Sequence, residues 1–120
     1  MIHLDASRRD EGWAACLAAY KMDAPIPEGW EVLAVIDAGA VVGAVLVNGP
    51  EAHIGINGSR NIRHVLRSVI GAQLERYGYA TTSVRKCNEA GHRFVSRIGY
   101  VKTHEQGGIV HYVLRELRYG

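Results

Sequence analysis

The spacing of apolar residues along the chain predicts alternating strands and helices. Runs with apolar residues at every second position, bounded by short Gly-containing turns, predict strands. Runs in which apolar residues recur every three or four positions predict helices. Strands are expected at residues 1–5, 30–37, 41–47, 51–56, 79–86, 100–104 and 109–117. Helices are expected in a segment capped by Ser7, at residues 60–77 and within residues 87–100.

This order, β-α-β-β-β-α-β-α-β-β, predicts one α/β (α+β) domain over residues 1–120, with a mixed sheet and flanking helices. The 48% hydrophobic and 22% charged residues are typical of a globular protein. No apolar run approaches the roughly 20 residues that cross a bilayer, so no membrane association is expected. A formal net charge of +2 does not point to nucleic acid.

The two cysteines, Cys16 and Cys87, form neither a disulfide framework nor a metal site. Two reduced thiols, together with a charged N-terminus unlike a signal peptide, predict a cytoplasmic protein. His104, Glu105 and His111 gather near the last predicted turn but lack metal-site spacing, so no metal is expected.

The stretch CNEAGHRFVSRIGY, residues 87–100, places Asn88 after a predicted strand and ends a predicted helix with Gly99 and Tyr100. The purely structural interpretation is a helix with Phe94 in the core and Gly99 as its C-terminal stop. With Gly91 in the intervening register, the stretch also resembles the GNAT family of N-acetyltransferases.

That resemblance implies a mostly antiparallel GNAT-like sheet and a site for acetyl-CoA or coenzyme A. The backbone of Ile54 and Ile56 would pair with the pantetheine arm on one side, and residues 83–85 would form the opposite wall. Asn88 would lie beside the arm.

The family binds the coenzyme pyrophosphate with a Gly-containing loop at the start of the long helix, where backbone N–H groups hold an anion. The positions that align with this loop are Gly58, Ser59, Arg60, Asn61, Ile62 and Arg63. Asn61 and Arg63 occupy the two glycine positions, so the loop is degenerate. Basic residues on one helix face offset this loss and predict a clamp for cofactor phosphate, although a solvated face is the alternative: Arg60, Arg63, His64 and Arg67.

Many relatives place a tyrosine seven residues after the Asn, where it protonates the leaving thiolate; here that position is Val95. His92, one turn earlier, is the nearest substitute acid. Glu51 and His53 alternate to one face of the strand beside the expected cleft and are the candidate bases, with a structural histidine as the alternative for His53.

Two functions remain in view. The first is an acetyl-CoA-dependent N-acyltransferase that acts slowly on an amine of a small molecule or protein. The second is a GNAT-fold binding or structural protein, resembling the acetyltransferase-like internal virion proteins of short-tailed bacteriophages, which would place it in the virion. Residues 112–114, on a predicted terminal strand, could pair across a homodimer edge.

Overall fold

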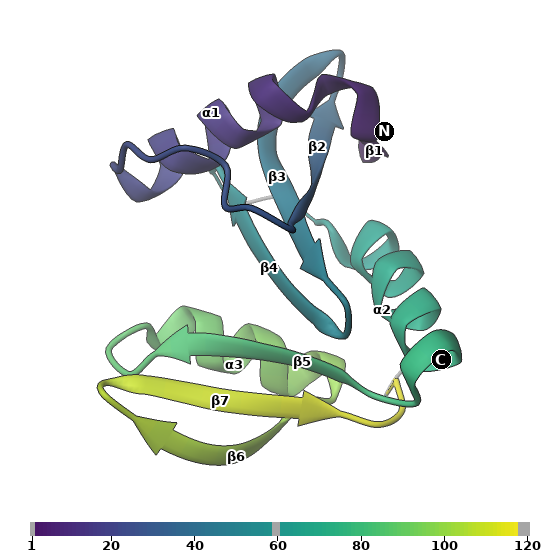
Figure 1. The fold of residues 1–120 in the computed structure, drawn as a ribbon, viewed down its shortest axis with the longest axis vertical. Helices are drawn as coiled ribbons and strands as arrows, with labels where there is room; N and C mark the ends of the chain where they lie inside the picture. Colours follow the sequence, from purple (N-terminus) through teal and green to yellow (C-terminus); the bar gives the residue numbers. More distant parts are fainter. Residues whose placement is uncertain (1, 59–60, 118–120) are drawn as a thin grey trace. The chain divides into compact units, whose positions relative to one another are not determined.

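A computed structural model describes residues 2–58 and 61–117 and shows an α+β fold (Figure 1). The strands are β1 (Ile2–Asp5), β2 (Glu31–Asp37), β3 (Ala40–Asn48), β4 (Glu51–Ile56), β5 (Ala80–Arg85), β6 (Val101–Gln106) and β7 (Ile109–Leu114). The helices are a short 3-10 turn (Ala6–Arg8), α1 (Arg9–Tyr20), α2 (Arg63–Tyr77) and α3 (Glu89–Ile98). This confirms the predicted fold class and element order.

The seven strands form one mixed, mostly antiparallel sheet in the order β1-β2-β3-β4-β5-β7-β6. The backbone contacts divide the chain into two compact units, residues 1–48 with 52–66 and residues 49–51 with 67–120. The single-domain assignment stays a prediction.

In the first unit, α1 packs against β2 and β3, and glycine makes this close approach possible (Figure 1). A Cβ atom on Gly12 would lie 2.8 Å from both the Cα and the Cβ of Ala34. The core beneath the helix consists of small and branched side chains, with larger residues packed around it: Cys16, Val32, Ala44 and Leu46, then Trp13, Ile26 and Trp30. The absence of a side chain at Gly12 therefore brings the helix into contact with the sheet.

The cap predicted at Ser7 for the first helix is wrong. The Asp5 side chain accepts the Ser7 backbone N–H at 2.9 Å and begins the 3-10 turn instead. Helix α1 then starts at Arg9, and the residue before it makes no side-chain cap hydrogen bond. The Asp5 carboxylate, at the end of β1, also accepts the Ser7 hydroxyl proton at 2.6 Å, so the Ser7 side chain is bonded to Asp5 rather than to the helix.

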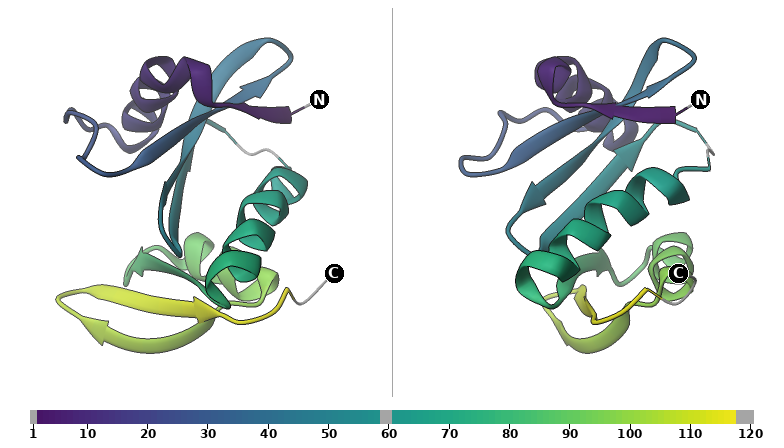
Figure 2. Two further views of the ribbon diagram at one scale, coloured as in Figure 1. Left: turned by 45° about the vertical axis from the view of Figure 1, so that its right-hand side comes forward. Right: turned by 90° about the vertical axis from the view of Figure 1, so that its right-hand side faces the viewer.

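In the second unit, β5 and β7 pair antiparallel and β6 pairs with the other side of β7. Helix α3 contacts β5 and lies on one face of this three-stranded layer (Figure 2). The homodimer edge predicted at residues 112–114 is wrong, because β7 is hydrogen bonded on both sides. The edge strand is β6, whose residues are all exposed and include Lys102 and Glu105, a composition that disfavours strand addition.

Two element bounds differ from the prediction by three residues. Helix α2 begins at Arg63 rather than residue 60, where the Asn61 side chain accepts the Arg63 N–H at 3.3 Å. Strand β7 ends at Leu114 rather than residue 117. Both ends lie where pairing or capping, rather than apolar periodicity, determines the boundary.

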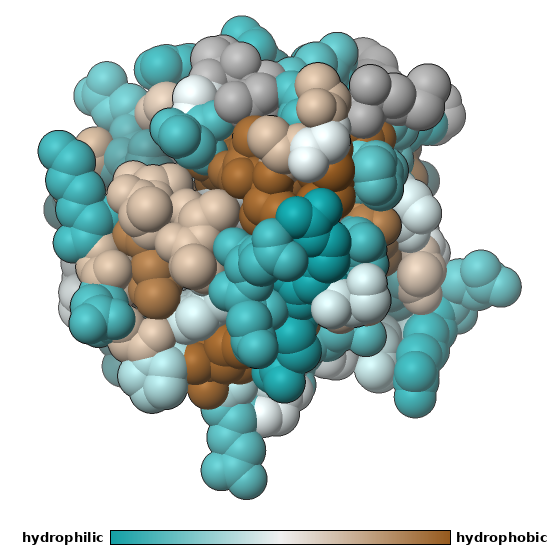
Figure 3. Space-filling model, turned by 90° about the horizontal axis from the view of Figure 1, so that it is seen from above, coloured by the Kyte–Doolittle hydropathy of each residue, from teal (hydrophilic) through white to brown (hydrophobic). Residues whose placement is uncertain are grey.

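Polar and apolar side chains are interspersed over the face shown in Figure 3. Large exposed hydrophobic residues include Tyr20 and Met22, at and just beyond the end of α1. Within the described residues, no helix is both long enough and apolar enough to span a membrane.

Candidate functional site

The second unit contains a pocket of about 470 Å³ on one face of its strands. Its lining combines carboxylate, imidazole, guanidinium and hydroxyl groups: Glu51, Tyr79, Thr81, Thr82, Ser83, Thr103, His104, His111, Tyr112, Val113 and Arg115. A solvated sheet face is ordinary in antiparallel proteins. A hollow lined by several groups capable of acid–base chemistry is a stronger indication of a binding site.

The strand register explains why these side chains meet. Glu51 pairs with Thr81, and Thr81 pairs with Val113, so the three lie in one row across the sheet. Ser83 pairs with His111, which forms the next row on the same face. Alternate residues point to opposite faces, so the side chains of Thr82 and Tyr112 are directed to the face covered by α3, although both residues also border the pocket. Glu51 was a candidate base from the sequence alone. Strand pairing places the hydroxyl groups of Thr81 and Ser83 near it.

The two histidines of the β6–β7 hairpin stack in parallel. The ring centroids of His104 and His111 are 4.4 Å apart, with 6° between their planes. The Thr103 hydroxyl donates its single proton to the His111 carbonyl at 3.2 Å, so it accepts from His104 Nδ1 at 3.0 Å. His104 therefore carries a proton on Nδ1, and in the neutral ring its Nε2 is an acceptor.

Glu51 is held in place by a buried side chain of α2. The Gln73 amide, only 4% exposed, donates to the carbonyl oxygens of Gly49 at 3.0 Å and Glu51 at 3.2 Å. The Thr81 N–H also donates to the Pro50 carbonyl at 2.7 Å. These bonds restrain the β3–β4 turn, so the Glu51 backbone has a defined position at the pocket.

Asn88 begins α3, and this local role was not anticipated. Its Oδ1 accepts the Gly91 N–H at 3.0 Å, so it is the helix N-cap. A Cβ on Gly91 would lie 2.6 Å from Asn88 Nδ2 and 2.9 Å from a Val84 methyl group. The small residue of the motif thus permits the contact of α3 with β5. The signal in the sequence was Asn followed by Glu89 in the first turn.

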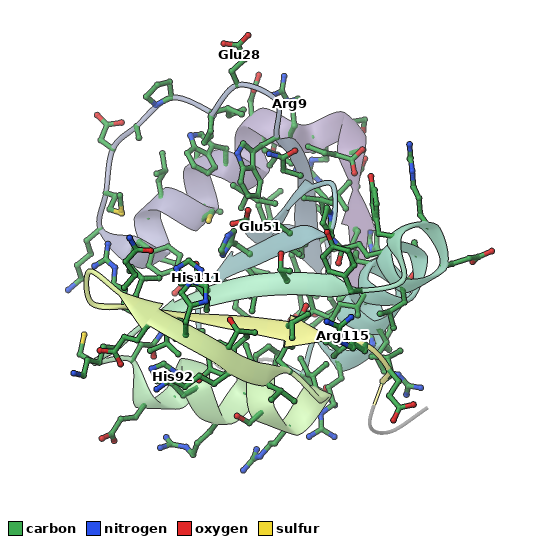
Figure 4. All side chains as sticks on the ribbon, turned by 60° about the horizontal axis from the view of Figure 1, so that its bottom comes forward. Arg9, Glu28, Glu51, His92, His111 and Arg115 are labelled. Atoms are coloured by element: carbon green, nitrogen blue, oxygen red, sulfur yellow. The ribbon has the colours of Figure 1, made fainter. Side chains whose placement is uncertain are left out.

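His92 makes hydrogen bonds through both ring nitrogens. Its Nε2 is 2.9 Å from the Arg85 carbonyl, which only accepts, so Nε2 carries a proton. Its Nδ1 is 2.6 Å from the Tyr112 hydroxyl. His92 therefore links α3 to β5 and β7 on the face opposite the pocket (Figure 4). Val95, the position of the usual tyrosine, is buried at 8% exposure.

In the first unit, one side of β4 presents backbone groups away from β3. The Asn57 N–H donates to the Val42 carbonyl of β3 at 2.7 Å. Since alternate residues direct their backbone groups to opposite sides, Ile54 and Ile56 direct theirs away from β3. The Tyr20 hydroxyl donates to the Ile54 carbonyl at 2.7 Å and occupies it.

His53 and Glu51, predicted to share one face of β4, have different surroundings. The His53 ring lies 5.6 Å from the Trp30 ring, at 44°, in the first unit. Glu51 belongs to the second unit and its pocket.

The segment before α2 contains the predicted phosphate loop. Gly58 has a φ of 80°, a conformation that favours glycine. Ile62 is buried at 4% exposure, and Arg63 is exposed. The His64 ring donates to the Ile2 carbonyl of β1 at 3.2 Å, so it is directed toward that strand. Ser59 and Arg60 lie outside the described residues.

Burial raises the pKa of two side chains, Tyr100 and Cys16. It raises the pKa of Tyr100, the aromatic residue after α3, to about 12. It also raises the pKa of the Cys16 thiol, which keeps that thiol neutral and unreactive. In the described part of the chain, no three His, Cys, Asp or Glu side chains form a group that could hold a metal ion.

No family model matches the sequence, and no curated protein matches it. Solved structures do match the fold. The ribosomal-protein-alanine N-acetyltransferase of Escherichia coli aligns with a TM-score of 0.74 at 14% identity, over 100% of this chain and 97% of that one. A GNAT family acetyltransferase of Elizabethkingia anophelis with acetyl-CoA bound gives 0.73 at 11% identity, over 97% of each chain.

The PaiA N-acetyltransferase of Thermoplasma acidophilum in complex with coenzyme A gives a TM-score of 0.67 at 9% identity, over 97% of this chain and 99% of that one. None of these three is a phage virion protein, so the expectation of a virion component gains no support from them. At such identities the likeness concerns the fold alone. The chain has the fold of the GNAT acetyltransferases.

Proposed function

We propose that the protein is an acetyl-CoA-dependent N-acyltransferase. The observation that carries this proposal is the fold likeness over the whole chain, with a TM-score of 0.74 to an N-acetyltransferase. Two further structures of the same fold were solved with acetyl-CoA or coenzyme A. Because one fold hosts many functions, the proposal also needs residues of this chain that suit the cofactor and the reaction.

The side of β4 that faces away from β3 suits the pantetheine arm at Ile54 and Ile56. An amide-containing arm can add to a strand edge through backbone hydrogen bonds, and Ile54 and Ile56 direct such groups away from β3. The Ile54 carbonyl is the acceptor that the Tyr20 hydroxyl holds at 2.7 Å. Cofactor binding at this carbonyl therefore requires Tyr20 to release it, and Tyr20, 54% exposed, has room to move.

The start of α2 suits a phosphate group. The N-terminal end of a helix carries a partial positive charge, and the first turn of α2 contains no acidic residue. We propose that the phosphates lie at Gly58, Ser59, Arg60, Asn61, Ile62 and Arg63, with the exposed Arg63 guanidinium as a charged donor. Asn88 uses its amide oxygen for the helix cap, and we propose that its Nδ2 group is a hydrogen-bond donor for the cofactor.

When bound, acetyl-CoA supplies a thioester, whose acyl carbon forms a bond to the amine nitrogen while the C–S bond breaks and its electron pair leaves with sulfur. Glu51, in the polar pocket, is the proposed base for the amine proton, and His53 on the same strand is the second candidate. His92 is the proposed proton donor to sulfur, and its Nε2 proton must first leave the Arg85 carbonyl that accepts it at 2.9 Å. We infer slow transfer, since buried Val95 lacks the hydroxyl that a tyrosine would supply.

The cofactor proposal is tested by calorimetric titration with coenzyme A and acetyl-CoA. Arg63→Gln is expected to weaken binding by about 1–3 kcal/mol, the scale of a lost charge-assisted hydrogen bond. Arg76→Gln, at the other end of α2, is the matched control and should bind like the parent. Tighter binding by Arg63→Gln would show that this side chain obstructs the loop, and no heat at millimolar coenzyme A would overturn the proposal.

Catalysis is tested by release of free thiol from acetyl-CoA in the presence of amines. Glu51→Gln should lower the rate by about 10²-fold or more if this carboxylate is the base. A protein that binds acetyl-CoA yet releases no thiol with any amine would be a binding protein of the same fold, the second function considered from the sequence.

A further inference from the structure

The pocket of the second unit carries opposite charges at separate corners. Glu51 lies two strands away from Val113 in one row, His111 lies two residues before Val113 on β7, and Arg115 follows the end of β7 and lines the same pocket. With about 4.8 Å between strands and about 3.3 Å per residue, the Cα atom of His111 is about 12 Å from that of Glu51. Figure 4 shows these three side chains around β5 and β7.

The same register directs Glu51 and His111 to a common face. His111 and Val113 alternate with Tyr112, which bonds to His92 of α3 on the opposite face. Arg115 lines the pocket from just beyond the end of β7. Thr81 and Ser83, on β5, lie between Glu51 and β7. The pocket thus has an anionic corner, a cationic side and hydroxyl groups between them.

The cationic side is built from donors. Arg115 presents a planar fork of N–H groups that matches a carboxylate. Close by, the His111 ring stacks on the His104 ring, with 4.4 Å between centroids. The Thr103 hydroxyl is hydrogen bonded to the His111 carbonyl and to the His104 ring. A carboxylate placed on this side would meet the Arg115 guanidinium beside the stacked imidazole rings, and repulsion keeps it away from Glu51.

We propose that this pocket binds a small molecule carrying both an amine and a carboxylate. The ammonium group lies toward Glu51, and the carboxylate toward Arg115 and His111. The hydroxyl groups of Thr81 and Ser83 contact the middle of the molecule. That this molecule is the acyl acceptor rests on the proposed function, in which Glu51 takes the amine proton, but the binding itself does not require coenzyme A.

The binding is tested with two matched series of ligands, titrated at neutral pH and followed by calorimetry and by NMR shifts of the His104 and His111 rings. The first series is β-alanine, 4-aminobutyrate and 6-aminohexanoate. The second is the alkylamines with the same numbers of carbon atoms, which lack the carboxylate. We expect at least one amino carboxylate to bind about tenfold or more tightly than its alkylamine, the scale of one charge-assisted bond.

Two variants test whether Arg115 contacts the carboxylate of the ligand. Arg115→Gln should bring the amino carboxylates to the affinity of the alkylamines. Arg93→Gln, which removes an exposed charge of the same kind from α3 on the opposite face, should leave binding unchanged. Equal affinity of the two series, no binding of either, or full binding by Arg115→Gln would each overturn the proposal.

The outcomes separate this proposal from the proposed function. Acyl transfer to plain alkylamines, with no preference for amino carboxylates, would retain the transferase and remove the pocket assignment. Arg115-dependent binding of amino carboxylates by a protein that does not bind coenzyme A would retain the pocket and remove the transferase.

Discussion

Replacing Gly55 with alanine is expected to destabilise the protein, whereas the same change at Gly71 is expected to stabilise it. On β4, a Cβ at Gly55 would lie 2.6 Å from the Tyr20 ring and still closer to Cys16 Sγ. In α2, a Cβ at Gly71 would have no heavy atom within 4 Å. Neither glycine has a positive φ, so alanine fits both backbones. The two sites therefore differ only in the room available for the new methyl group.

The magnitudes follow from these contacts. Overpacking of a core costs about 1–3 kcal/mol, and alanine recovers about 0.4–1 kcal/mol by restricting the unfolded chain. The Tyr20 ring can swing outward, but it then loses its 2.7 Å bond to the Ile54 carbonyl, worth about 0.5–1.5 kcal/mol. We expect a loss of about 1–2 kcal/mol for Gly55→Ala and a gain of about 0.5–1 kcal/mol for Gly71→Ala.

Urea denaturation followed by circular dichroism measures both free energies of unfolding. In the double variant Gly55→Ala/Cys16→Ala, removal of the buried sulfur provides space for the new methyl group. Its loss should therefore be smaller than the sum of the two single losses. The reasoning is refuted if Gly55→Ala is as stable as the parent, or if the two alanine variants change stability equally.

Three further predictions concern other elements. Tyr20→Phe frees the Ile54 carbonyl, so coenzyme A should bind more tightly in calorimetry; weaker binding would mean that the hydroxyl contacts the ligand. Asn88→Ala should lower the free energy of unfolding by about 1 kcal/mol through loss of the α3 cap, and Asn88→Asp should retain most of it; equal losses would exclude the cap. Burial raises the pKa of Tyr100 to about 12, above its unfolded value of about 10. The folded state therefore keeps the proton longer, and stability should fall between about pH 10 and 12, a slope absent from Tyr100→Phe in urea titrations.

Much of the fold could be predicted because its signals are local. The predicted bounds of β4 at residues 51–56 agree with the structure, and the helix between Asn88 and Gly99 is confirmed. These elements follow from apolar spacing and from residues with strong positional preferences, which depend on a few neighbours in the chain. The caps of α1 and α2 were less predictable, because several polar side chains near each end could satisfy the same N–H groups.

The candidate site was only partly predictable. Glu51 was predicted as a candidate base from its strand, and it lines the pocket. Ser83 and Arg115, which line it too, carried no signal of their own. The sequence placed His104 and His111 near the same predicted turn, but it assigned them no function. Their stack depends on a register irregularity between Lys102 and His104 in the β6–β7 ladder. Alternation shows which residues of one strand share a face, but it does not show which strand lies beside it.

The sequence by itself determined the strands, the helices and the groups each could present. Only the tertiary structure decided that β7 lies between β5 and β6, so that Thr81 and Ser83 meet Val113 and His111. It also decided that Tyr20 reaches the Ile54 carbonyl across 34 residues. The physical reason is that such contacts depend on strand register and on the packing of distant segments, and a shift of one residue would turn every one of these side chains to the opposite face.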